Sequence, residues 1–130
     1  MTQATEQTHG SAARDPLFGW LDHPTANAAL IGLCGDKVEF YLAIRDGVIA
    51  DVRYYSEGCD HLRSRAAAVA RRAKGKAILD ALAISPRAII DADECLPEKG
   101  WHCAILAVST LHRAIASYLL DRQALQERQS

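Results

Sequence analysis

Alternating apolar and polar residues define the clearest element of the chain, a strand that begins near Lys37. Its apolar residues recur at every second position, at Val38, Phe40, Leu42 and Ile44. This period of two is typical of a half-buried strand. Asp46-Gly47 then supplies a two-residue turn that accepts positive φ, and Val48 to Tyr55 is rich in β-branched and aromatic residues. The pattern predicts a β-hairpin.

A helical period replaces the strand period after Cys59. The apolar stripe of this first helix consists of Leu62, Ala66, Val69, Ala70 and Ala73. A short second helix is predicted over Ala77 to Ala83, and a third begins at the N-cap and first-turn pair Ser85-Pro86. A long last helix is predicted from Trp101 to about Gln123. Helices that follow a hairpin predict an α+β domain with helices packed on one face of a small antiparallel sheet.

The segments before the hairpin are less regular. Residues Met1 to Arg14 are polar and lack an apolar period, so we expect a disordered tail followed by a single domain over residues 15–130. Asp15 to Pro24 is apolar but broken by glycine, which indicates a loose turn or an apolar flap. Ala28 to Ile31 is interpreted as a brief edge strand.

Composition excludes several partners and compartments. The chain has 15 basic and 16 acidic residues and a net charge of -1, so we expect no general attraction to nucleic acid or to an anionic membrane. Its first residues do not read as a signal peptide, and no run reaches the roughly 18 apolar residues of a membrane span. We therefore expect a cytoplasmic protein, in which the 4 cysteines are thiolate ligands, nucleophiles or buried thiols rather than a disulfide framework.

Basic residues flank the apolar stripe of the first helix on both sides. They are Arg63, Arg65, Arg71, Arg72, Lys74 and Lys76. We interpret them as a solvated face. The alternative is a docking surface for an acidic partner, whose binding would weaken with salt.

Three cysteines lie where one predicted element gives way to the next. Cys34 precedes the hairpin and Cys59 follows it, so antiparallel pairing brings both to the same end of the sheet. Cys59 and Cys103 each lie at a helix start, where the helix dipole is expected to lower a thiol pKa. Gly35 and Gly58 lack side chains and would let a bulky inorganic group approach. The pattern predicts a metal site assembled by the tertiary fold.

Asp36 and His102 are the candidates for a fourth ligand. Three thiolates with aspartate or histidine suit a zinc ion, and three thiolates with one replaceable ligand also suit a [2Fe-2S] cluster. The residues alone leave these two occupants open, and His102 is equally compatible with a surface role. The fourth cysteine, Cys95, is interpreted as a core-facing thiol.

The order and flanks of these motifs resemble the NifU/IscU-type iron-sulfur cluster assembly scaffolds. The resemblance covers about Gly32 to Tyr118. The motifs that carry it are Leu33-Cys34-Gly35-Asp36, Asp46-Gly47, Gly58-Cys59, Lys74-Gly75-Lys76, Cys95-Leu96-Pro97 and His102-Cys103-Ala104-Ile105-Leu106-Ala107. Some loops differ from the family pattern, which is typical of a divergent paralogue.

The resemblance implies a scaffold or carrier rather than an enzyme. Cys34, Cys59 and Cys103 would hold a transient [2Fe-2S] cluster, Asp36 would ease its release, and His102 would stand by as an alternative ligand. The implied partners are a cysteine desulfurase as sulfur donor, an iron donor, and apo iron-sulfur proteins that accept the cluster. The family's chaperone-recognition loop has the sequence Leu-Pro-Pro-Val-Lys. Here the loop is Leu96-Pro97-Glu98-Lys99-Gly100, so the resemblance does not imply that a chaperone binds this protein.

Two other functions fit the residues. The first is a zinc-binding regulatory or adaptor paralogue that has lost cluster assembly. The second is a thiol enzyme with Cys59 or Cys103 as nucleophile, which ranks last because the sequence offers no convincing base to activate the thiol.

Overall fold

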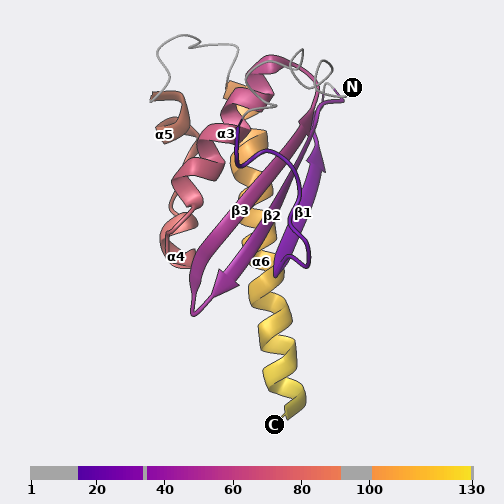
Figure 1. Cartoon of the computed structure of the whole chain (residues 1–130), viewed down its shortest axis with the longest axis vertical. Coiled ribbons are helices and arrows are strands. Elements are labelled where there is room, and N and C mark those ends of the chain that lie inside the picture. The colour runs from indigo at the N-terminus through magenta and orange to yellow at the C-terminus, as the bar shows by residue number, and fades with distance from the viewer. Residues whose placement is uncertain (1–14, 34, 92–100, 130) are drawn as a thin grey trace.

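The computed structural model describes residues 15–33, 35–91 and 101–129 as an α+β arrangement. Three antiparallel strands form one sheet in the order β1-β2-β3 (Figure 1). The strands are β1 (Ala26–Ile31), β2 (Lys37–Arg45) and β3 (Val48–Glu57). The predicted edge strand is therefore present and begins two residues earlier than expected.

The predicted hairpin is confirmed by the pairing of β2 with β3. Asp46 and Gly47 form its turn with φ of 54° and 75°, so the turn uses the positive φ that an Asp-Gly pair accepts. The register runs from Arg45 opposite Val48 to Lys37 opposite Glu57, with one irregularity between Ala43 and Ile44. This register decides which residues meet at the far end of the sheet.

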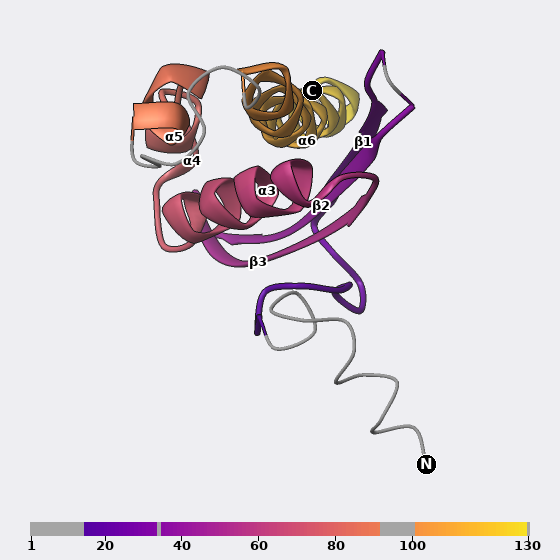
Figure 2. The same ribbon diagram turned by 90° about the horizontal axis from the view of Figure 1, so that it is seen from above.

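Helices α3, α4, α5 and α6 lie on one face of the sheet (Figure 2). Their bounds are Asp60–Ala73, Ile78–Ala81, Pro86–Asp91 and Trp101–Gln129. The Ser85 hydroxyl accepts a hydrogen bond from the Ala88 amide at 3.1 Å, so Ser85 caps the start of α5 as predicted. The last helix extends six residues beyond the predicted end near Gln123.

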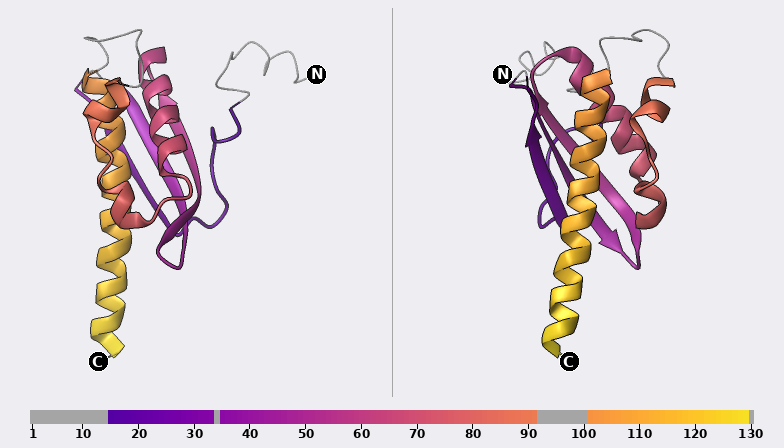
Figure 3. Two further views of the ribbon diagram at one scale, coloured as in Figure 1. Left: turned by 90° about the vertical axis from the view of Figure 1, so that its left-hand side faces the viewer. Right: turned by 180° about the vertical axis from the view of Figure 1, so that it is seen from behind.

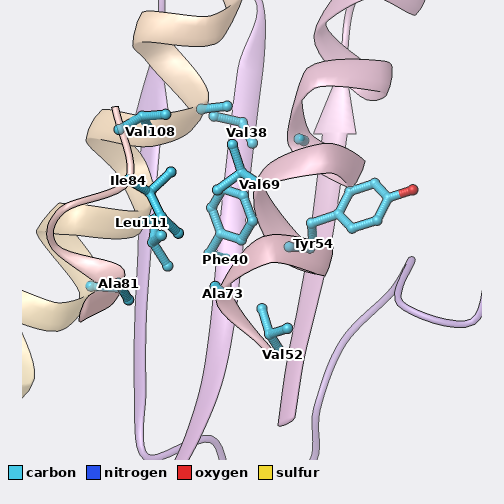
Figure 4. Close-up of a cluster of buried hydrophobic side chains, with 14 of the residues drawn as sticks. Val38, Phe40, Val52, Tyr54, Val69, Ala73, Ala81, Ile84, Val108 and Leu111 are labelled. Carbon is cyan, nitrogen blue, oxygen red and sulfur yellow. The ribbon is translucent and has the colours of Figure 1, made fainter. Parts of the chain in front are cut away.

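The core lies between the helical layer and the sheet (Figure 4). The inward residues of the strands include Phe40 and Val52, both 0% exposed. The α3 stripe is buried as predicted, and α6 contributes Val108 and Leu111 to the same cluster. Hydrophobic burial along both helices fixes them against the sheet, and this in turn fixes where each helix begins.

The segment before β1 covers the free edge of β3. The Tyr54 amide donates to the Leu17 carbonyl at 2.9 Å, and the Gly19 amide donates to the Tyr54 carbonyl at 2.8 Å. The Tyr54 hydroxyl lies 2.7 Å from Asp15 Oδ2, and the Phe18 ring packs edge-on against the Tyr54 ring. Asp15 to Pro24 is thus an apolar flap that protects a sheet edge.

The C-terminal half of α6 projects past the end of the sheet (Figure 3). Leu120 and Leu125 are 65% and 52% exposed there. Within the described residues, Trp101–Glu127 is the one helix long and apolar enough to match a membrane span by length and composition, and 44% of its window is buried in the protein. Because that buried part packs on the sheet, such a match is weak evidence for a membrane role.

One surface prediction is wrong. Arg65 was expected to lie on the solvated basic face, but its side chain is buried, with 1% exposure. Its spacing of three residues from Leu62 and four from Val69 places it on the apolar face of α3, and that face packs against the sheet and α6. The predicted tail, residues 1–14, lies outside the described residues.

Candidate metal centre

The candidate centre forms at the end of the sheet where β2 begins and β3 ends (Figure 1). Lys37 pairs with Glu57, so the residues just outside this pair, Asp36 and Gly58, meet across the hairpin. Cys59 follows as the N-cap of α3. Cys103 lies in the first turn of α6, whose start reaches the same end of the molecule. Four elements therefore contribute to one small region.

Three donor side chains come together in this region. The ligand atoms of Asp36, Cys59 and Cys103 all lie within 4.8 Å of one another. Cys59 Sγ is 3.7 Å from Asp36 Oδ2, which makes a weak thiol–carboxylate hydrogen bond. The separations suit three groups converging on one ion at metal–ligand distances of about 2.0–2.3 Å.

Gly58 makes room for the carboxyl group of Asp36. A Cβ at position 58 would overlap Asp36, approaching its Cγ to 2.5 Å. Gly58 also has a φ of +131°, a conformation that residues with side chains rarely adopt. Any other residue here would displace the carboxyl group or the turn, so the arrangement depends on glycine.

The two thiols differ in their access to solvent. Cys59 is exposed and Cys103 is buried, with 1% exposure. Burial, together with the nearby Cys59 and Asp36, raises the pKa of Cys103 to about 12. The expectation that the helix start lowers this thiol pKa is wrong, because desolvation and neighbouring negative charge outweigh the helix dipole.

His102 lies beside the centre but outside the group of three. Its Nε2 is 3.7 Å from Cys103 Sγ, and its side chain is exposed. Asp36, by contrast, is within 4.8 Å of both thiols. Of the two candidates for the oxygen or nitrogen ligand, Asp36 is therefore the better placed in this structure.

Two of the cysteines lie outside the described residues. These are Cys34, predicted as a ligand, and Cys95, interpreted as a core thiol. Cys34 lies in the chain two residues before Asp36, on the connection between β1 and β2.

The donor set fits a soft or borderline metal centre. Two thiols and a carboxylate match the ligands of tetrahedral zinc, and cysteine thiolates also hold iron-sulfur clusters. The exposed Cys59 leaves one side of this group open to solvent.

The chain belongs to the family described as NifU-like N terminal domain, whose model matches residues 19–124. The match includes every candidate ligand, from Cys34 to Cys103. The family membership was predicted from the motifs and is confirmed.

Among relatives by sequence is the iron-sulfur cluster assembly scaffold protein IscU 1 of Archaeoglobus fulgidus. It is 35% identical over 86 residues, which are 66% of this chain and 56% of that protein. The chain thus matches little more than half of this relative's length. IscU of Escherichia coli (strain K12), a protein with the same description, is 35% identical over 92 residues, 70% of this chain and 71% of that protein.

Solved structures support the fold. A NifU-like protein (N-terminal) from Brucella abortus superimposes with a TM-score of 0.61 at 21% identity, covering 82% of this chain and 88% of that chain. A scaffold protein for the SUF system from Fervidobacterium islandicum gives a TM-score of 0.62 at 18% identity, with coverages of 78% and 88%. At these identities the likeness establishes the α+β fold alone.

Proposed function

We propose that this protein is an iron-sulfur cluster assembly scaffold or carrier that holds a transient [2Fe-2S] cluster on Cys34, Cys59 and Cys103. The observation that carries the proposal is the convergence of Asp36, Cys59 and Cys103 within 4.8 Å at an end of the sheet that is open to solvent. Relatives described as cluster assembly scaffolds, at 35% identity, support the same conclusion.

The thiolate ligands and the carboxylate ligand have different roles, in holding and in releasing the cluster. The thiolates are strong, soft ligands that hold iron, whereas a carboxylate is a harder ligand that is more easily replaced. Asp36 is therefore the fourth ligand through which the cluster leaves, and His102 is the alternative ligand. One domain spanning residues 15–130 carries these groups.

The cluster is cargo and not a resident cofactor, so the protein is a carrier and not an enzyme. Sulfur comes from a cysteine desulfurase and iron from an iron donor. Apo iron-sulfur proteins accept the cluster. We place this work in the cytoplasm, without nucleic-acid or membrane partners.

The test is anaerobic reconstitution with ferrous iron, cysteine and a desulfurase, followed by visible absorption and acid-labile sulfide. Each of Cys34, Cys59 and Cys103 is replaced by serine, and Cys95→Ser is the matched control. We expect the parent and Cys95→Ser to form the cluster and the other three variants to lose it. A parent protein that forms no cluster would reject the proposal.

A zinc-binding regulatory or adaptor paralogue is the second candidate. The donor set of Asp36, Cys59 and Cys103 favours it as well, because two thiolates and a carboxylate also suit tetrahedral zinc. Metal analysis of the purified protein, with desulfurase activity measured with and without zinc, distinguishes the two. Stoichiometric zinc that blocks cluster formation and alters the desulfurase rate would favour the regulatory role.

A further inference from the structure

Arg65 is the largest of the side chains in the described chain that are less than 2% exposed. It lies on α3 between Leu62 and Val69, both 0% exposed, on the face that packs against the sheet and α6. Burying a guanidinium is costly unless negative charge lies close enough to compensate it. The surroundings of Arg65 must therefore supply compensating negative charge.

Helix geometry directs this side chain toward the candidate centre. Side chains on an α-helix lean toward its N-terminus, and Cys59 is the N-cap of α3. Arg65 is about 9 Å along the helix axis from Cys59 at a rise of about 1.5 Å per residue, and a lean of its long side chain toward the N-terminus shortens that distance. The same end of α3 lies beside the start of α6, which carries Cys103 (Figure 3).

The electrostatics agree with this placement. Burial first, and then Cys59 and Asp36, raise the pKa of Cys103, and the positive charge of Arg65 partly opposes them. The guanidinium is therefore within electrostatic reach of the buried thiol. Low dielectric strengthens such an interaction, and solvent ions screen it little.

Metal binding makes the centre more anionic. Cysteine binds metals as the thiolate, so each coordinating cysteine loses a proton and adds a negative charge to that of Asp36. Three thiolates and a carboxylate carry more negative charge than a divalent cation neutralises. A buried positive charge nearby therefore favours the loaded state electrostatically.

We propose that Arg65 is a positioning residue whose buried guanidinium balances the negative charge of the ligand set, and so increases metal affinity without being a ligand. The inference rests on the part of the proposed function that makes this cluster of donors a metal site. It does not require that an iron-sulfur cluster be built.

The test compares Arg65→Met, Arg65→Gln and Arg65→Lys in the full chain, with Arg63→Met as the matched control. Arg63 is on the same helix but its side chain is 34% exposed and paired with Asp60 at 3.0 Å. Co²⁺ is the probe, titrated anaerobically while the thiolate-to-cobalt absorption is followed. Unfolding by urea monitors the stability of each variant.

We expect Arg65→Met and Arg65→Gln to bind Co²⁺ about 10- to 100-fold more weakly than the parent, the range typical of groups that support metal ligands from outside. Arg65→Lys should recover most of the affinity, and Arg63→Met should stay within about twofold, as expected for an exposed pair. The effect of Arg65 should persist at about 1 M salt, where the Debye length is about 3 Å.

Equal Co²⁺ affinity in the parent and in Arg65→Gln would overturn the proposal, because the two residues are both polar but only arginine is charged. If Arg65→Met does not fold, the Co²⁺ affinities of Arg65→Gln and Arg65→Lys are compared instead. Equal affinities in these two variants would likewise overturn the proposal. A parent that binds Co²⁺ through its cysteines but builds no cluster would reject the scaffold function and leave this inference standing.

Discussion

The carboxyl group of Asp36 occupies the space in which Gly58 would otherwise carry a side chain. A Cβ at residue 58 would lie 2.5 Å from Asp36 Cγ, and Cys59 Sγ, one residue further on, is 3.7 Å from Asp36 Oδ2. The pairing of Lys37 with Glu57 brings these residues opposite each other. The hairpin register and one glycine thus place a carboxylate beside a thiol.

Gly58→Ala should weaken Co²⁺ binding by displacing Asp36. Gly75→Ala is the matched control, because Gly75 also has a positive φ, of +87°, but no atom lies within 4 Å of its added Cβ. Both substitutions should lower the unfolding free energy by about 1–3 kcal/mol through backbone strain. Only Gly58→Ala should also reduce Co²⁺ affinity in the titration. Equal affinities in the two variants would show that the contact with Asp36 is irrelevant to the centre.

Asp36→Cys should slow the release of a bound metal. A fourth thiolate is a softer and stronger ligand for cobalt or zinc than a carboxylate. We expect stronger thiolate-to-cobalt absorption and slower transfer of the ion to a chelator such as EDTA. Asp60→Cys is the control, because Asp60 adjoins Cys59 in the chain but its side chain is 89% exposed and outside the group of donors. If both variants release cobalt at the parent rate, Asp36 does not contact the metal.

Tyr54→Phe should lower stability at neutral pH. The Tyr54 hydroxyl donates to Asp15 Oδ2 at 2.7 Å and holds the N-terminal flap on the edge of β3. Loss of this bond to a carboxylate should cost about 1–3 kcal/mol of unfolding free energy. Tyr118→Phe is the control, because Tyr118 is only half-buried on α6 and its hydroxyl accepts a bond of 3.3 Å from the exposed Arg122.

Tyr54→Phe should also make the stability of the protein less sensitive to alkaline pH. Burial, followed by the bond to Asp15, raises the pKa of Tyr54 above its ordinary value. The folded state therefore keeps the phenol proton where the unfolded chain loses it, so this contribution is complete below about pH 10 and declines as pH rises further. Urea unfolding at a series of pH values should show that Tyr54→Phe loses less stability above pH 10 than the parent. Parallel curves would contradict the assignment.

Leu111→Ala should be far more destabilising than Leu120→Ala. Leu111 is 0% exposed in the core, whereas Leu120 is 65% exposed on the projecting part of α6. We expect losses of about 2–5 kcal/mol for the first and below about 0.5 kcal/mol for the second. Urea unfolding measures both. Similar effects would contradict the packing of α6 as a core helix of this domain.

Periodicity predicted most of the fold because the strands and helices of this chain carry clear apolar patterns. Val38, Phe40 and Leu42 alternate on one face of β2, and all three are 0% exposed. Asp46-Gly47 predicted its turn from the chemistry of those two residues alone. The flap over β3 was only partly predictable, since its contacts with Tyr54 depend on a residue far away in the chain.

The sequence by itself determined the hairpin, the helical stripes and the motifs that carry the family likeness, since each depends on residues close together in the chain. Only the tertiary structure decided that Asp36, Cys59 and Cys103 meet, and that Cys103 and Arg65 are buried. The physical reason is that burial and charge at a site depend on which elements pack around it. Local patterns of apolar residues do not encode that arrangement.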